Sequence, residues 1–181
     1  MNLDNVHYLN MFLGMGAIVL QIFAVVSLLI LFFGPKKNSF FDYLEKHFLA
    51  ICFLISLIAT FFSLVYSEIV HFAPCYLCWY QRIFLFPQVI LFGIAFWDKD
   101  KKVIRYSLPL LCIGFVFSIY QNLMYYFGET GSVPCDSSGV SCYQQLISEF
   151  GGYISFPMLS LTAYFTILVL ILIVHFRQKS R

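Results

Sequence analysis

The sequence predicts an all-α integral membrane protein: a four-helix transmembrane bundle with one additional N-terminal transmembrane helix. The prediction rests on the composition, on charge-free stretches and on the distribution of basic residues. Of the 181 residues, 61% are hydrophobic, 20% aromatic and only 11% charged. Soluble domains contain about 25% charged residues, and disordered chains combine low hydrophobicity with high net charge. Both classes are therefore excluded.

Long stretches without Asp, Glu, Lys or Arg mark the expected membrane spans. Four of them, residues 11–33, 48–67, 106–128 and 150–174, each approach or exceed the roughly 20 residues that a helix needs to cross a bilayer. A fifth span covers residues 75–97 and is interrupted only by Arg82. We place the start of that helix near Pro74, because proline is tolerated where first-turn N–H groups have no intrahelical partner.

The basic residues predict the orientation of these five spans. Ten of the eleven Lys and Arg residues lie in residues 34–47, residues 98–105 and the C-terminal tail, which are alternate connections of the chain. Basic residues concentrate on the cytoplasmic side of membrane proteins, so we expect the N-terminus outside and the C-terminus in the cytoplasm. Because no basic stripe lies on a soluble face, we expect no nucleic-acid partner.

We expect two parts in the chain. Residues 1–47 would form the extra transmembrane helix and a cytoplasmic loop, and residues 48–181 a four-helix core. The first span could instead be a cleaved signal peptide. It lacks a basic segment before it and is longer than the usual apolar region of such a peptide, so we interpret it as a retained anchor.

Four of the six cysteines fall on the predicted outer side. Cys75 and Cys78 lie at the outer end of the third span, and Cys135 and Cys142 lie in the loop of residues 129–149. Disulfides form and persist on this side of a membrane. The four cysteines are therefore candidates for redox chemistry.

The first pair has two residues between its cysteines and stands at a predicted helix start. The positive end of the helix dipole favours a thiolate there, and a thiolate is the reactive form of cysteine. Cys75 and Cys78 could thus open and close as a reactive disulfide. The alternatives are a structural bridge, or half of a zinc site completed by Cys135 and Cys142.

Arg82 follows Cys78 by four residues and Cys75 by seven, so the three side chains share one helical face. An arginine inside a membrane is costly and is by default a candidate for function. The alternative is a side chain that extends to the lipid headgroups. Beside a dithiol, its positive charge could stabilise an anion such as a reduced quinone.

The second pair encloses a short polar loop that contains Gly139. Cys135 and Cys142 could form a structural staple for the outer connection. They could also form a mobile shuttle that exchanges disulfides with a soluble partner and with the first pair, chemistry that requires access to the sulfur atoms. We favour the shuttle.

Residues 74–82, Pro-Cys-Tyr-Leu-Cys-Trp-Tyr-Gln-Arg, resemble the signature of the DsbB family of thiol oxidases. More narrowly, the chain resembles the short-loop BdbC subgroup. The Pro-Cys start and the Gly-Val-Ser-Cys end of residues 134–142 fit that subgroup, as do the glycines at 151 and 152 and the Ile-Ser-Phe-Pro-Met-Leu-Ser-Leu stretch of residues 154–161.

The resemblance implies an enzyme of the bacterial cytoplasmic membrane. It would pass electrons from an extracytoplasmic thioredoxin-fold oxidase of the DsbA or BdbD type to the quinone pool of the bilayer, as ubiquinone or menaquinone. By the same resemblance, Cys78 would contact the quinone, Cys75 would be its disulfide partner and Arg82 would lie beside the quinone ring. Cys135 would form the mixed disulfide with the partner, and Cys142 would resolve it or link to Cys75.

Gln121, in the outer half of the fourth span, is a further candidate for quinone contact, but we favour a buried hydrogen bond between helices for it. The N-terminal span lies outside the family core. Three other functions remain open: a quinone-coupled enzyme similar to vitamin K epoxide reductase, a membrane scaffold or transporter with structural disulfides, and a metal-binding protein.

Overall fold

The computed structural model describes residues 3–33, 39–127 and 151–179, and this part of the chain contains five helices long and apolar enough to cross a membrane. They are α1 (Leu3–Phe33), α2 (Ser39–Leu64), α3 (Tyr76–Asp98), α4 (Val103–Phe127) and α5 (Phe156–Lys179), and a π-helical turn, η1 (Val65–Ile69), continues α2. The predicted all-helical membrane fold is confirmed. The direction in which the helices cross the bilayer stays a prediction.

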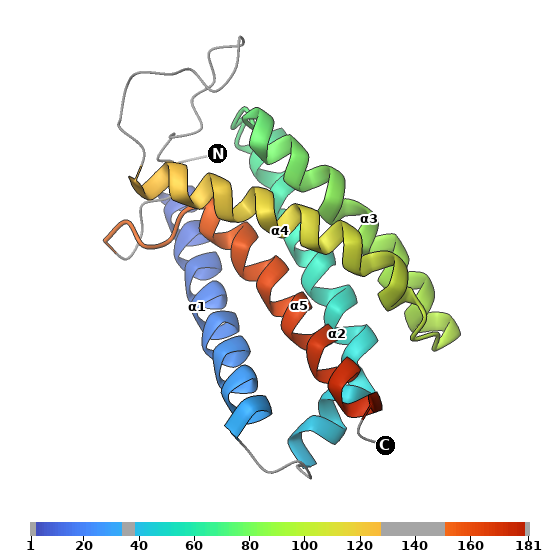
Figure 1. The fold of residues 1–181 in the computed structure, drawn as a ribbon. Coiled ribbons are helices and arrows are strands. Elements are labelled where there is room, and N and C mark those ends of the chain that lie inside the picture. The colour runs from blue at the N-terminus through green and yellow to red at the C-terminus, as the bar shows by residue number, and fades with distance from the viewer. Residues whose placement is uncertain (1–2, 34–38, 128–150, 180–181) are drawn as a thin grey trace.

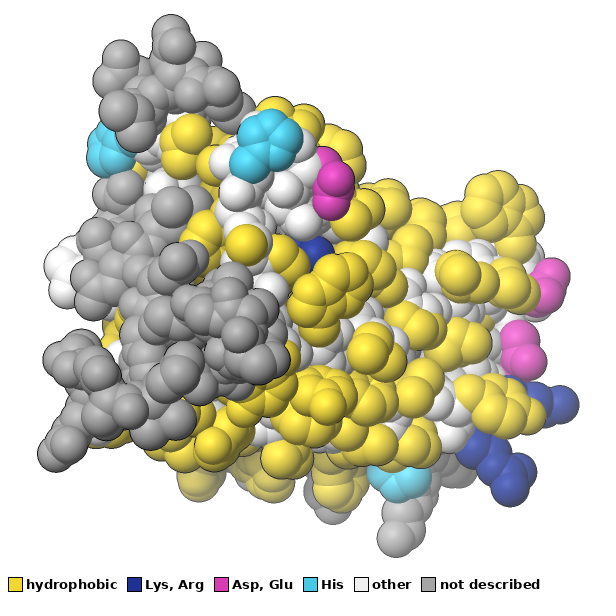
Figure 2. Space-filling view, turned by 90° about the horizontal axis from the view of Figure 1, so that it is seen from above, with side chains coloured by type: hydrophobic (Ala, Val, Ile, Leu, Met, Phe, Trp, Pro, Cys, Tyr) yellow, Lys and Arg dark blue, Asp and Glu magenta, His cyan; other side chains and the backbone are white. Residues whose placement is uncertain are grey.

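Successive helices run in opposite directions, and the two termini lie at opposite ends of the bundle (Figure 1). The start of α3 and the end of α2 lie at one end, which we call the dithiol end because it holds Cys75 and Cys78. Helix α5 packs against α1, α2 and α4, and its large side chains Tyr164, Ile167, Leu170 and Ile173 are fully buried. Hydrophobic side chains cover most of the described surface in Figure 2, as expected for helices that face lipid.

Three helix starts differ from the prediction by more than one helical turn. Helix α1 begins at Leu3 rather than near residue 11. Helix α2 begins at Ser39 rather than near residue 48, because the hydropathy pattern marks only the apolar part of a helix that continues into a charged segment. Helix α5 begins at Phe156 rather than near residue 150. Gly151 and Gly152 precede it with φ of 71° and 85°, a left-handed conformation that glycine adopts without steric cost and that ends helical continuity.

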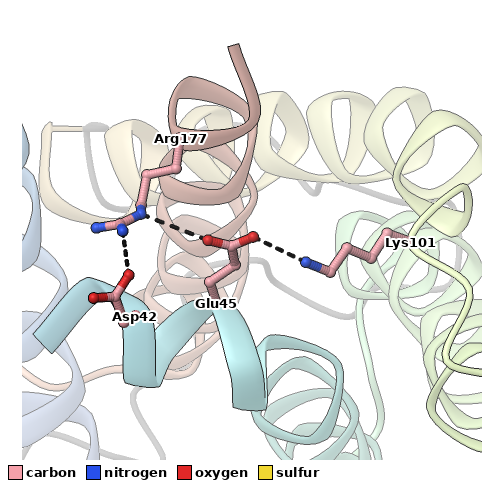
Figure 3. Close-up of polar contacts among 4 residues, drawn as sticks. All are labelled: Asp42, Glu45, Lys101 and Arg177. Atoms are coloured by element: carbon pink, nitrogen blue, oxygen red, sulfur yellow. Dashed lines mark hydrogen bonds and ion pairs between the residues drawn. The ribbon is translucent and has the colours of Figure 1, made fainter. Parts of the chain in front are cut away.

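The charged segment of α2 forms ion pairs at the opposite end of the bundle, which we call the ion-pair end (Figure 3). Glu45 Oε1 lies 3.1 Å from Lys101 Nζ, and Glu45 Oε2 lies 3.6 Å from Arg177 Nε. Arg177 also pairs with Asp42. Glu45 is buried, so its charge requires these partners. The network joins α2, the α3–α4 connection and α5.

Helices α4 and α5 approach each other closely where a glycine faces an aromatic ring. A Cβ atom placed on Gly114 would lie 2.4 Å from the Cζ and Oη atoms of Tyr164. The Tyr164 hydroxyl in turn donates a 2.7 Å hydrogen bond to the carbonyl oxygen of Gln81 in α3. The absence of a side chain at residue 114 therefore lets Tyr164 connect α5 to the helix that carries the dithiol.

We expect Gly114→Ala to destabilise the protein by about 1–3 kcal/mol, because overpacking a filled interior forces side chains or backbone to shift. Thermal unfolding of the protein in detergent would measure the loss. Gly16→Ala is the matched control, since nothing lies within 4 Å of a Cβ at that position. Equal melting temperatures for the two variants would contradict the close contact.

Candidate redox site

The two cysteines of the first pair lie together at the start of α3. Cys75 is the N-cap residue, with extended backbone angles of φ −68° and ψ 167°, and Tyr76 is the first helical residue. The predicted helix start near Pro74 is confirmed. The two Sγ atoms are 3.1 Å apart and both thiols are free. Because a disulfide is about 2.05 Å long, only a small movement separates this dithiol from the oxidised pair.

A glutamine side chain from α4 contacts both sulfur atoms. Gln121 Nε2 lies 3.4 Å from Cys75 Sγ and 3.4 Å from Cys78 Sγ. Its Oε1 accepts a 2.7 Å hydrogen bond from Gln81 Nε2, which orients the amide so that its N–H groups point to the thiols. Gln121 is buried. The hydrogen bond between helices expected for Gln121 is present, and its contact with a quinone stays a prediction.

A chain of buried hydrogen bonds thus leads from the interior of the bundle to the dithiol. The Tyr164 hydroxyl binds the Gln81 carbonyl, the Gln81 side chain binds Gln121, and Gln121 binds the sulfur atoms. Hydrogen-bond donors stabilise a thiolate more than a neutral thiol, because bonds to a charged acceptor are stronger. Gln121 therefore orients the dithiol and supplies a donor to whichever sulfur becomes a thiolate.

Arg82 is held by two serines at the end of α2 and in η1. Its Nε donates to Ser63 Oγ at 3.0 Å, its Nη2 to the Ser63 carbonyl at 2.8 Å and its Nη1 to Ser67 Oγ at 3.4 Å. The guanidinium carbon also lies 5.4 Å from the centre of the Trp79 ring. Among the described residues, no carboxylate lies within ion-pair distance of Arg82. Its hydrogen bonds go to neutral acceptors, and the exposed Glu68 carboxylate interacts with its charge from beyond ion-pair distance.

The structure brings Cys75, Cys78 and Gln121 into contact, and it places Arg82 one turn below Cys78 on the same helix. The second pair, Cys135 and Cys142, lies outside the described residues.

Three polar side chains of the site were not predicted from the sequence: Ser63, Ser67 and Gln81. Ser63 and Ser67 are four residues apart and so lie on one helical face. An arginine inside a predicted span requires polar partners, and this pair of serines on one face of the preceding span was the signal available for them.

The fold and the site together define a multi-pass helical membrane protein with a free, hydrogen-bonded dithiol at one end of the bundle. Residues 45–175 match the family described as "Disulfide bond formation protein DsbB". The chain belongs to this family, and its role is that of a disulfide-forming membrane oxidase.

Relatives that are named as disulfide formation proteins support the assignment. The chain is 38% identical over 139 residues to "Probable disulfide formation protein C 2" of Bacillus cereus, which covers 77% of this chain and 99% of that protein. It is 43% identical over 123 residues to "Disulfide bond formation protein C" of Bacillus subtilis, covering 67% and 88%. It is 39% identical over 124 residues to "Probable disulfide formation protein" of Coxiella burnetii, covering 68% and 84%. No solved structure matches the chain.

We expect Gln121→Leu to slow alkylation of the reduced Cys75–Cys78 pair by roughly tenfold or more, because a hydrogen bond to a charged group contributes about 1.5–3 kcal/mol. The measurement is the rate of iodoacetamide modification of the purified protein in which Cys52, Cys112, Cys135 and Cys142 are replaced by serine. Gln88→Leu is the matched control: Gln88 is a buried glutamine of α3 whose amide bonds the Phe84 carbonyl of its own helix. Equal rates for the two variants would show that Gln121 does not act on the thiols.

Proposed function

We propose that the chain is a quinone-dependent thiol oxidase that reoxidises an extracytoplasmic thioredoxin-fold oxidase of the DsbA or BdbD type. The observation that carries the proposal is the adjacency, on one helix, of a free dithiol and an arginine held by two serines. Family membership supports the disulfide-forming part. The arrangement of Arg82 supports the choice of acceptor.

Cys78 is the residue that we assign to the acceptor. It is partly exposed whereas Cys75 is 3% exposed, and it stands four residues before Arg82 on the same helical face. A thiolate at Cys78 would interact favourably with the guanidinium. Cys75 is its disulfide partner, 3.1 Å away, and Gln121 orients both sulfur atoms.

Arg82 fits an acceptor that becomes negatively charged and resides in the lipid phase. It lies in a helix long and apolar enough to cross a membrane, and its described hydrogen bonds go to Ser63 and Ser67 rather than to a carboxylate. A quinone, ubiquinone or menaquinone, would accept the two electrons and two protons released when Cys75 and Cys78 close to a disulfide. The guanidinium would stabilise the negative charge that arises there.

Cys135 and Cys142 would connect this site to the soluble partner. One thiol of the partner attacks this disulfide to form a mixed disulfide at Cys135 and releases the Cys142 thiol. The partner's second thiol then resolves the mixed disulfide, so two electrons and two protons pass to Cys135 and Cys142. The resulting dithiol then reduces the Cys75–Cys78 disulfide. Each step exchanges one disulfide for one dithiol, so electrons balance at every stage. This sequence requires all four cysteines on the extracytoplasmic side of the bacterial cytoplasmic membrane.

The assay that tests the function combines the purified protein, a reduced thioredoxin-fold oxidase and a soluble quinone analogue, and follows the reduction of the quinone. We expect the wild type to turn over and Cys78→Ser to lose turnover, because no second sulfur remains to complete the disulfide. Cys52→Ser is the control, since Cys52 is buried in the bundle away from the start of α3. A wild type without quinone reduction would favour the scaffold with structural disulfides.

Substitution of the arginine separates binding of the acceptor from thiol chemistry. We expect Arg82→His to raise the KM for the quinone analogue roughly tenfold or more, because the variant loses a hydrogen bond between the charged guanidinium and the quinone. Alkylation of the dithiol should continue. Arg105→His is the matched control, because Arg105 is exposed at the start of α4, at the ion-pair end. Unchanged quinone kinetics in Arg82→His would refute the place of Arg82 beside the acceptor.

A further inference from the structure

The family match begins at residue 45, so α1 lies outside it. Helix α1 nevertheless makes specific polar contacts with the rest of the bundle. Gln21 Nε2 donates to Thr162 Oγ1 at 2.8 Å, and the Tyr153 hydroxyl donates to Gln21 Oε1 at 3.0 Å. Nearer the dithiol end, buried Asn10 accepts a hydrogen bond from the Tyr66 hydroxyl. This last contact links α1 to the segment that holds Arg82.

Tyr66 belongs to η1. In the sequence it lies between Ser63 and Ser67, the two serines that bind Arg82. Its side chain is 2% exposed, and its ring meets that of Phe156 edge to face at 4.7 Å. Ala17 of α1 and Ile154 complete the same buried cluster. The segment of residues 63–67 is therefore held from two sides: α1 contacts Tyr66, and Arg82 binds Ser63 and Ser67.

The backbone of this turn departs from the α-helical pattern. The N–H of Val70 bonds the carbonyl of Val65 at 3.1 Å, a bond that spans five residues. Such π-helical turns are rare and occur frequently at functional sites. A turn of this kind depends on contacts from its surroundings, because its own hydrogen bonding is less favourable than that of a regular helix.

We infer that α1 braces the η1 turn and thereby sets the position of the Arg82 guanidinium. Asn10 and Tyr66 are the positioning residues: the hydrogen bond between them fixes the turn, and the turn presents Ser63 and Ser67 to Arg82. The inference rests on the proposed function only in taking Arg82 as the residue beside the acceptor. It gives the additional N-terminal helix a role at the acceptor end of the electron path.

A fluorescence experiment tests the brace without any quinone. The chain has two tryptophans, so Trp97→Phe leaves Trp79, whose ring lies 5.4 Å from the Arg82 guanidinium carbon, as the single reporter. In this background we expect Tyr66→Phe to change the emission maximum of Trp79 and to raise its acrylamide quenching. Asn10→Ala removes the acceptor of the same hydrogen bond and should give the same change.

Tyr153→Phe is the matched control, because it removes another tyrosine hydroxyl that bonds α1, at Gln21 rather than at Asn10. It should leave Trp79 emission unchanged. In the quinone assay, Tyr66→Phe should raise the KM for the soluble analogue roughly threefold to tenfold, the effect of one lost hydrogen bond, with kcat retained. Tyr66→Phe in the Arg82→His background should add nothing further.

Trp79 emission that is the same in Tyr66→Phe, Asn10→Ala and Tyr153→Phe would overturn the brace. A changed emission with an unchanged KM would leave the brace in place and overturn the assignment of Arg82 to the acceptor. A wild type that reduces no quinone would refute the proposed function, while the fluorescence result would still decide the inference.

Discussion

The structure depends on a single constraint: each polar group placed inside an apolar bundle must find a partner within the protein. In a bilayer no water is available to satisfy it. The charged groups, Glu45 at the ion-pair end and Arg82 near the dithiol, are the most demanding. For Arg82 the chain meets the demand with two serines and one backbone carbonyl of a neighbouring segment, so the arginine is fixed in place by neutral acceptors.

The same constraint organises the opposite flank of α3. Gln81 is adjacent to Arg82 in the sequence, but its amide bonds Gln121 while its carbonyl accepts from Tyr164. Two polar networks therefore start from consecutive residues of α3, Gln81 and Arg82. One leads through Gln121 to the dithiol, and the other leads through Ser63 and Ser67 towards α1. The sulfur atoms and the guanidinium are positioned by different neighbours, so each can be perturbed separately.

The sequence was sufficient to predict the helices and the reactive pair, because both follow from local patterns. Charge-free stretches report apolar helices, and the spacing of Cys75, Cys78 and Arg82 reports one helical face. The partners of these residues could not be predicted, because they depend on how helices pack. Ser63 and Gln81 are unremarkable in the sequence, and they become part of the site only through contacts 19 and 40 residues away along the chain.

The two ends of the bundle satisfy their charges in different ways, and the difference bears on function. At the ion-pair end, Asp42 and Glu45 are matched by Lys101 and Arg177, so charges cancel and the helices are tied together. At the dithiol end, the described contacts of Arg82 are neutral oxygen atoms. An arginine in a close ion pair would gain little from an anion formed nearby. Arg82 is hydrogen-bonded to serines and interacts with exposed Glu68 only from beyond ion-pair distance, so it can still attract such an anion. The chain thus places rigidity at one end and an available positive charge beside the dithiol at the other.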